Sequence, residues 1–212
     1  MNDNINIAQI VRSEHNDNHI GRCYESPDGC FRYVPIPKCG STSGEDWCNA
    51  HAWSRENFVD DRKDTQYLVI LRDPWQRWCS AIDMYIRWKN GLNKSWNQIN
   101  TSHLEVIERT VIMDQHSEKQ STFLHGLRYS QCKFLPLDET LSKKWKEITG
   151  KEFPFVHWDP ETDKSILGNE RKNSNTEWFH KLRYNEKWFN RFKKIYQYDY
   201  QIFDKIKTSS KA

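Results

Sequence analysis

The stretch FRYVPIPKCGSTS, residues 31–43, contains the pattern that decides the fold. Its first part, Phe31 to Ile36, predicts a short strand. The residues from Thr42 to about Ser54 lack proline and space their tryptophans as a helix does. We therefore expect a strand, a loop and a helix in this order, with Ser41 or Thr42 as the helix N-cap.

The loop between this strand and helix predicts an anion site. A glycine-containing loop at a helix N-terminus offers backbone amides, a positive dipole end and hydroxyls to a phosphate. A Walker A loop has the pattern GxxxxGK[ST], whereas here no glycine immediately precedes Lys38 and no Ser or Thr immediately follows it. A solvent-exposed turn that contains a lysine is the alternative. The predicted binding residues are Pro37, Lys38, Cys39, Gly40, Ser41, Thr42 and Ser43.

A second segment predicts another phosphate contact at the same sheet edge. The continuous apolar run 67–71 is typical of a strand buried on both faces of a parallel sheet. Arg72 follows that strand directly, and Ser80 lies about one turn into the predicted helix 75–88. Ligands gather at the carboxyl ends of parallel strands, so Arg72 and Ser80 are expected near Lys38. A purely structural role for Arg72 and Asp73, with Arg77 on the helix surface, is the alternative.

The remaining pattern predicts an α/β class: a P-loop-like three-layer fold with a small central parallel sheet flanked by helices, and a helical C-terminal segment. We expect one domain over 1–212, with an N-terminal extension and hairpin (1–30), a nucleotide-binding core (31–90) and a helical remainder (91–212). The hairpin turns at residues 26–29. Further predicted elements are helices over 102–113, 138–148 and 177–206 and a strand over 133–137.

Composition limits the partners. The formal net charge of +3 is too small to indicate nucleic acid as a partner. No apolar run approaches the roughly 20 residues that span a bilayer, so we expect an unanchored, cytoplasmic protein. The six cysteines form no CxxC pair, and no metal site is expected. A disulfide between Cys23 and Cys30 across the hairpin stays open at this point.

The two motifs PKCGSTS and RDPWQRWCSA (72–81) resemble the nucleotide-binding motifs of sulfotransferases that use 3′-phosphoadenosine-5′-phosphosulfate (PAPS). Their order and the spacing from Arg72 to Ser80 both agree with that family. The segments Asp114-Gln115-His116, Gln120, 132–134 and 138–141 are similar to the middle of the Golgi-type carbohydrate sulfotransferases. The ending Tyr198-Asp199-Tyr200 is similar to their last helix.

The resemblance implies transfer of a sulfuryl group from PAPS to an acceptor hydroxyl, on a carbohydrate, without a metal. The loop around Lys38 would hold the 5′-phosphosulfate, and Arg72 with Ser80 the 3′-phosphate. His116 is favoured as the general base because a histidine suits proton transfer near neutrality. His51, Glu45 and Glu56 compete with it. Lys172 and Asn173, in a basic loop, are expected to close over the nucleotide.

Two departures from that family appear in the sequence. The linker 44–71 is shorter than in many relatives, so the acceptor site must come from other segments. The relatives are usually membrane-anchored in a secretory compartment, and the lack of an anchor suggests a microbial or viral setting.

Two other functions stay open. One is a P-loop kinase or nucleotide hydrolase, for which Asp73 is the obvious Mg²⁺ ligand. The other is a carbohydrate-binding protein that uses Trp75, Trp78, Trp88 and Trp96.

Overall fold

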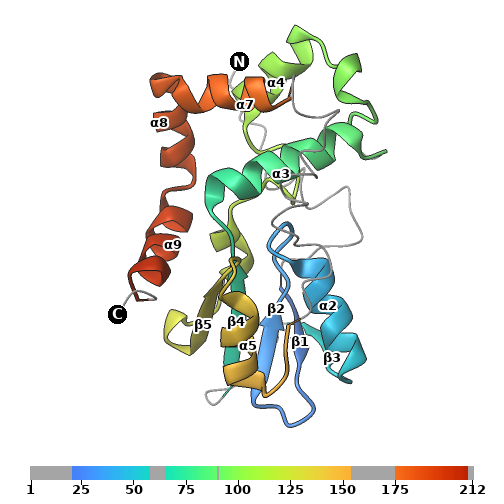
Figure 1. Cartoon of the computed structure of the whole chain (residues 1–212), viewed down its shortest axis with the longest axis vertical. Helices are drawn as coiled ribbons and strands as arrows, with labels where there is room; N and C mark the ends of the chain where they lie inside the picture. The colour runs from blue at the N-terminus through green and yellow to red at the C-terminus, as the bar shows by residue number, and fades with distance from the viewer. Residues whose placement is uncertain (1–20, 58–64, 90, 154–174, 210–212) are drawn as a thin grey trace.

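The structure is a computed structural model that describes residues 21–57, 65–89, 91–153 and 175–209. A β-sheet occupies one end of the molecule and a group of helices the other (Figure 1). Lys172 and Asn173, which were predicted to cover the nucleotide, lie outside the described residues.

The sheet is mixed, because it contains antiparallel strands beside the parallel strands that were predicted. Its strands are β1 (Arg22–Glu25), β2 (Phe31–Val34), β3 (Ser54–Asn57), β4 (Gln66–Leu71) and β5 (Cys132–Pro136). They lie in the order β3-β1-β2-β4-β5. Strands β2, β4 and β5 are parallel, whereas β1 is antiparallel to both of its neighbours. The sequence analysis missed β3 because all four of its residues are exposed, so it shows no apolar pattern.

The predicted hairpin is present, and its turn explains the register of β1 and β2. The Ser26 amide donates to the Phe31 carbonyl at 2.9 Å, and Gly29 supplies a positive φ of 70°. The Asp28 carboxylate accepts from the Ser26 hydroxyl at 2.6 Å. Cys23 and Cys30 are both free, so the hairpin carries no disulfide between them.

Helices α2 (Ser41–Ala50) and α5 (Leu141–Thr149) pack on one face of the sheet. Trp145 of α5 contacts both Tyr33 of β2 and Trp47 of α2, with ring centroids 5.5 and 5.2 Å apart. Gly44 allows α2 to approach β2, because a Cβ there would lie 2.4 Å from the Tyr33 hydroxyl. Helix α9 (Gln197–Ser209) contributes Phe203 and Ile206 to the same core and lies beside β5 (Figure 1).

A second apolar core joins α3 (Pro74–Arg87), α4 (Thr101–Thr110), α7 (Asn175–Tyr184) and α8 (Glu186–Ile195). Trp75 and Trp78 stack at 5.4 Å in its centre, and both are buried. Short 3-10 helices lie at 96–98, 120–124 and 129–131.

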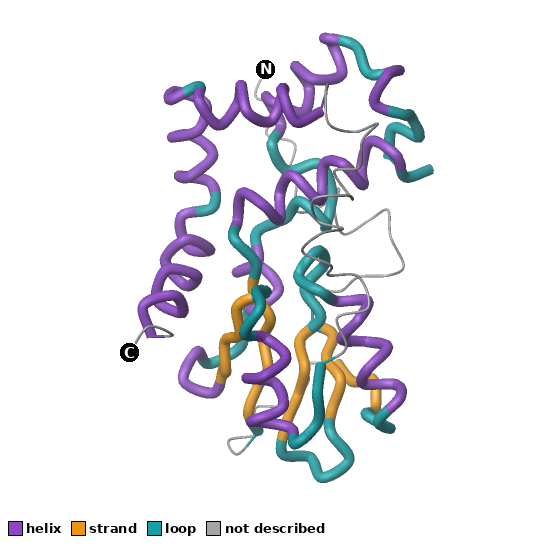
Figure 2. Tube along the Cα trace, in the orientation of Figure 1, coloured by secondary structure: helices purple, strands orange, loops and turns teal. Residues whose placement is uncertain are grey.

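The single helix predicted over 177–206 is wrong, because three helices occupy this span (Figure 2). The first break comes at Asn185, whose side chain accepts the Trp188 amide at 3.1 Å and so caps α8. The second comes at Tyr196, where the chain passes from the second core to the first. The apolar residues that repeat along 177–206 therefore pack into two cores rather than one.

Candidate functional site

The loop 37–40 and Arg72 meet at the carboxyl ends of two neighbouring parallel strands. Val34 of β2 is in register with Val69 of β4. The loop leaves β2 three residues beyond Val34, and Arg72 follows β4 directly. The predicted adjacency of these two segments at one sheet edge is thus present in the fold.

The start of α2 differs from the prediction in its cap. The N-cap is Gly40, in the left-handed region at φ 75°, and no side chain caps the first turn. Neither Ser41 nor Thr42 is the cap, and Ser43 is buried within the first turn. The first-turn amides of a helix have no partner within the helix, so they remain suited to an anion.

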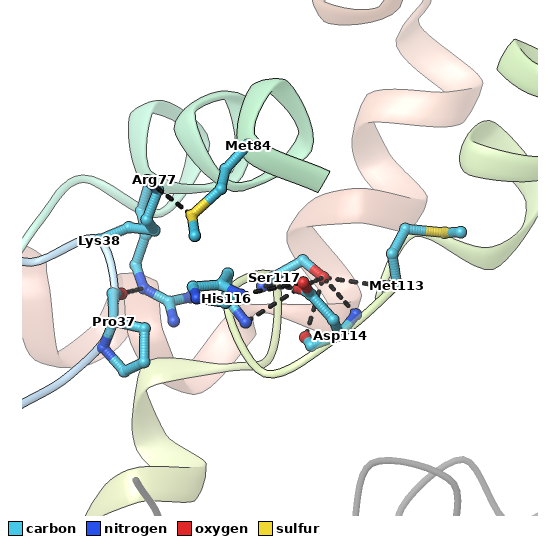
Figure 3. A network of polar contacts seen from close by, with 8 residues as sticks. All are labelled: Pro37, Lys38, Arg77, Met84, Met113, Asp114, His116 and Ser117. Carbon is cyan, nitrogen blue, oxygen red and sulfur yellow. Dashed lines mark hydrogen bonds and ion pairs between the residues drawn. The ribbon is translucent and has the colours of Figure 1, made fainter. Parts of the chain in front are cut away.

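Lys38 supplies a desolvated positive charge beside this turn. Its backbone has a φ of 66°, and its Nζ lies 3.3 Å from the Met84 sulfur on α3 (Figure 3). Burial lowers the pKa of the Lys38 ammonium, and the nearby charges of Arg72 and Arg87 lower it further. The carboxylates of Asp83 and Asp114 raise this pKa, but the net effect is a lowered value. Among the described residues, Lys38 has no carboxylate partner in an ion pair.

Gln120 connects the two segments through its side chain. Its Oε1 accepts both the Cys39 thiol and the Arg72 amide, each at 3.0 Å. Its Nε2 donates to the Arg72 carbonyl at 2.9 Å. The side chain of Cys39 therefore points to Gln120, and the contribution of Cys39 to the loop is structural.

Asp199 of α9 holds Gln120 in place. Its two carboxylate oxygens accept the amides of Gln120 and Ser121 at 2.7 and 2.9 Å. Burial raises the pKa of Asp199, although these hydrogen bonds and nearby Arg77 act in the opposite direction. The last described helix is in this way tied to the loop around Lys38.

Arg77 clamps the loop to the segment 114–120. It is 1% exposed, so the alternative of a surface helix residue is wrong. Its Nε donates to the Pro37 carbonyl at 2.8 Å (Figure 3). Its Nη1 donates to the Glu118 carbonyl. Its Nη2 is buried with no hydrogen-bond partner among the described residues. A buried guanidinium of this kind leaves positive charge at the site.

An Asp–His pair lies in the segment clamped by Arg77. His116 is 8% exposed, and its Nδ1 lies 2.9 Å from Asp114 Oδ2. Burial would raise the pKa of Asp114, but its hydrogen bonds with His116 and Ser117 outweigh that and lower the pKa. The ring of Trp88, which follows α3, meets the imidazole at a right angle with centroids 5.2 Å apart.

The other predicted residues are placed as follows. Ser80 is half-buried on α3, four residues before Met84 and therefore on the same side of that helix. His51 lies at the opposite end of α2 from the loop, stacked on Trp47 at 4.2 Å, with Nδ1 2.8 Å from the Trp47 carbonyl. Glu56 is exposed on the edge strand β3. Asp73 caps α3 by accepting the Gln76 amide at 3.0 Å.

The sequence predicted no role in the site for Arg77, Gln120, Asp114 or Asp199. One signal was present, because all four lie within the segments that carry the family resemblance. The contacts themselves join residues as far apart as 79 positions, which local patterns do not encode.

No family model, curated protein or solved structure matches this chain. In the described part of the chain, no helix is long and apolar enough to cross a membrane. The same residues contain no group of three or more His, Cys, Asp or Glu side chains arranged to hold a metal ion.

Proposed function

We propose that this chain is a sulfotransferase that moves a sulfuryl group from PAPS to an acceptor hydroxyl on a carbohydrate. The observation that carries the proposal is the meeting of Lys38 and Arg72 at the ends of β2 and β4. Neither cation has a carboxylate partner in an ion pair among the described residues. Two separated cationic positions suit a donor with anionic groups at both its 5′ and 3′ positions.

The donor requires several anion contacts, and the residues present fit that need. Lys38 and the first-turn amides of α2 would hold the 5′-phosphosulfate, while Arg72 and Ser80 would hold the 3′-phosphate. The buried Nη2 of Arg77 adds positive charge behind the loop. Lys38 carries a lowered pKa from burial, and an anion beside it would restore its preference for the charged form.

Sulfuryl transfer demands positioning, charge stabilisation and one proton acceptor. The acceptor oxygen forms a bond to sulfur while the bond from sulfur to the 5′-phosphate oxygen breaks, and adenosine 3′,5′-bisphosphate leaves. The acceptor hydroxyl gives its proton to His116. Lys38 offsets the negative charge that grows on the leaving phosphate oxygen.

The two rival functions receive less support. The carboxylate of Asp73, proposed as a Mg²⁺ ligand for a kinase, is engaged as the cap of α3. Trp75 and Trp78, proposed as sugar-stacking residues, lie in the second core. Trp88 and Trp96 are half-buried. Trp96 packs against the second core and donates to the Asp83 carboxylate, and Trp88 contacts the His116 ring.

Two measurements test the proposal. Calorimetry should detect adenosine 3′,5′-bisphosphate binding in EDTA, and ³⁵S-labelled PAPS should label an oligosaccharide from a broad acceptor panel. Lys38→Ala should reduce transfer at least about 100-fold, as expected for loss of one preorganised charge contact at the transition state. Lys89→Ala, at an exposed lysine just beyond α3, is the matched control and should transfer normally.

A preference for Mg-ATP over adenosine 3′,5′-bisphosphate would overturn the proposal in favour of a kinase. Glycan binding without turnover, unchanged in Lys38→Ala, would overturn it in favour of a carbohydrate-binding protein.

A further inference from the structure

We propose that Asp114 is a positioning residue that fixes which nitrogen of His116 accepts a proton. This inference rests on the proposed function, because it assigns a role within the same site. It concerns the ring of His116 and its tautomer, which can be observed without any turnover.

The two carboxylate oxygens of Asp114 accept hydrogen bonds from different groups. Oδ1 accepts the amides of His116 and Ser117 at 2.9 and 3.1 Å, and the Ser117 hydroxyl at 3.2 Å. These contacts shape the turn 114–117. Oδ2 lies 2.9 Å from His116 Nδ1. An ionised carboxylate only accepts hydrogen bonds, so Nδ1 must carry the proton and Nε2 is the basic nitrogen.

The ring is also held from a second side. Trp88 contacts it at an interplanar angle of 87°, and Figure 3 shows the ring, in projection, between Asp114 and the guanidinium of Arg77. The clamp from Arg77 to Pro37 and Glu118 joins the turn 114–117 to the loop around Lys38. A hydroxyl that reaches the donor at this loop would therefore meet a ring of fixed orientation.

Several charged or titratable groups surround this pair. Lys38 comes from the loop, Arg77 and Tyr85 from α3, Glu118 from the same segment and Tyr196 from the end of α8. Of these five groups, Glu118 is the one carboxylate besides Asp114 itself. When His116 accepts a proton, Asp114 Oδ2 is the anion in direct contact with the imidazolium. The bond to a charged acceptor strengthens as the ring becomes charged.

The substitution Asp114→Asn separates the two roles. The oxygen of the new amide must stay at the Oδ1 position, because the His116 and Ser117 amides donate there. The amide nitrogen then takes the Oδ2 position and donates to Nδ1. This forces the ring proton onto Nε2, so the nitrogen that should act as the base is blocked.

The primary readout is the ¹⁵N spectrum of the histidine rings, with His116 assigned by comparison with His116→Gln. Wild-type protein should show the Nδ1–H tautomer, and Asp114→Asn should show the Nε2–H tautomer. Transfer by Asp114→Asn should fall about 100- to 10,000-fold in kcat, as for other histidine bases that lose their orienting carboxylate. KM for PAPS should stay within about twofold, because Asp114 is not among the residues proposed to hold the donor.

The kcat and KM values add a readout that a purely structural role would not separate. In Asp114→Asn, kcat should fall while KM for PAPS stays nearly constant. Glu118→Gln is the matched control. It removes a carboxylate of the same segment that bonds to Lys119 and Thr122 and is not hydrogen-bonded to the His116 ring. Its kcat and its His116 tautomer should match those of wild-type protein.

Each result has one meaning. An Nε2–H tautomer in wild-type protein, or an equal loss of kcat in Asp114→Asn and Glu118→Gln, would overturn the role of Asp114. If Asp114→Asn fails to fold, the tautomer of His116 in wild-type protein alone decides whether Asp114 positions the ring. Absence of turnover in wild-type protein that shows the Nδ1–H tautomer would refute the proposed function and leave the positioning of the ring intact.

Discussion

The geometry of the site depends most on the side chain of Gln120. It is 1% exposed. Its amide oxygen accepts two hydrogen bonds, and its amide nitrogen donates one hydrogen bond to the Arg72 carbonyl. One side chain thus sets the separation between the loop that holds Lys38 and the end of β4. A charge at that position would meet no cationic partner among these contacts, so glutamine fits better than glutamate.

Replacing Gln120 by leucine tests this dependence. The Arg72 amide would lose its acceptor within the protein, and burying an unsatisfied group costs about 1–3 kcal/mol. We expect urea unfolding to show a loss of about 2 kcal/mol and calorimetry to show at least tenfold weaker binding of adenosine 3′,5′-bisphosphate. Gln76→Leu, exposed on α3, serves as the control. Unchanged nucleotide affinity in Gln120→Leu would show that the loop and Arg72 are positioned without Gln120.

The lowered pKa of Lys38 predicts how nucleotide affinity varies with pH. In the free protein, Lys38 loses its proton as the pH rises through this lowered pKa, below the ordinary value of about 10.4. Binding of the dianionic phosphate then requires proton uptake, so affinity should fall by up to about tenfold per pH unit in this window. Affinity should be flat below it, down to about pH 7, since a phosphate monoester starts to take up a proton only toward its second pKa of about 6.

The comparison for this pH effect is Lys38→Arg, whose guanidinium stays charged throughout. Its affinity should be independent of pH over the same range. A wild-type affinity that does not fall on the alkaline side would mean that Lys38 does not contact the nucleotide.

At the scale of elements, helix α2 is positioned by two glycines at its start. Gly40 adopts the left-handed conformation that turns the chain from the loop into the helix. Gly44 gives α2 a flat surface against Tyr33. The helix thereby directs its first turn toward the edge where β4 ends.

The substitution Gly44→Ala should disturb this packing. Alanine favours a helix by about 1 kcal/mol over glycine, but its Cβ would lie 2.5 Å from two ring carbons of Tyr33. Overpacking of this kind costs about 1–3 kcal/mol. We expect a net loss of about 1 kcal/mol in urea unfolding, together with weaker nucleotide binding. Asp46→Ala, exposed on the same helix, should not lose stability; a gain of stability in Gly44→Ala would contradict the close approach.

The elements that could be predicted from sequence are those whose pattern is local. The buried run 67–71 became β4, and the turn 26–29 joined β1 to β2 as expected. β3 has no apolar residue, and the break at Asn185 interrupts an apolar stripe that continues past it. In the candidate site, the adjacency of Lys38 and Arg72 could likewise be predicted, because it follows from the order of the strands. The contacts of Arg77, Gln120 and Asp199 could not, because they join residues far apart in the sequence.

At the scale of the whole molecule, Asp199 ties the last described helix to Gln120, which in turn holds the loop around Lys38 and the end of β4. Both of its oxygens accept backbone amides, and the Tyr196 hydroxyl donates to the Ser117 carbonyl nearby. The two apolar cores lie on either side of this junction. The position of α9 therefore influences the loop around Lys38 through Gln120.

Asp199→Asn should weaken this junction. Asparagine offers one acceptor oxygen, so its amide nitrogen would face the Gln120 or Ser121 amide and leave it unsatisfied. We expect a loss of about 1–3 kcal/mol in the free energy of unfolding, with nucleotide affinity falling alongside it. Asp204→Asn, exposed on the same helix, provides the comparison. Equal stability of the two variants would rule out a structural role for the Asp199 carboxylate.

The contact between Asp199 and Gln120 also has a consequence during synthesis of the protein. The loop 37–40 and β4 are made before α9, which carries Asp199. Until α9 is made, the Gln120 and Ser121 amides lack their carboxylate acceptor. On the proposed function, growing chains that still lack α9 should therefore bind nucleotide weakly, even though both predicted phosphate-binding motifs are already made.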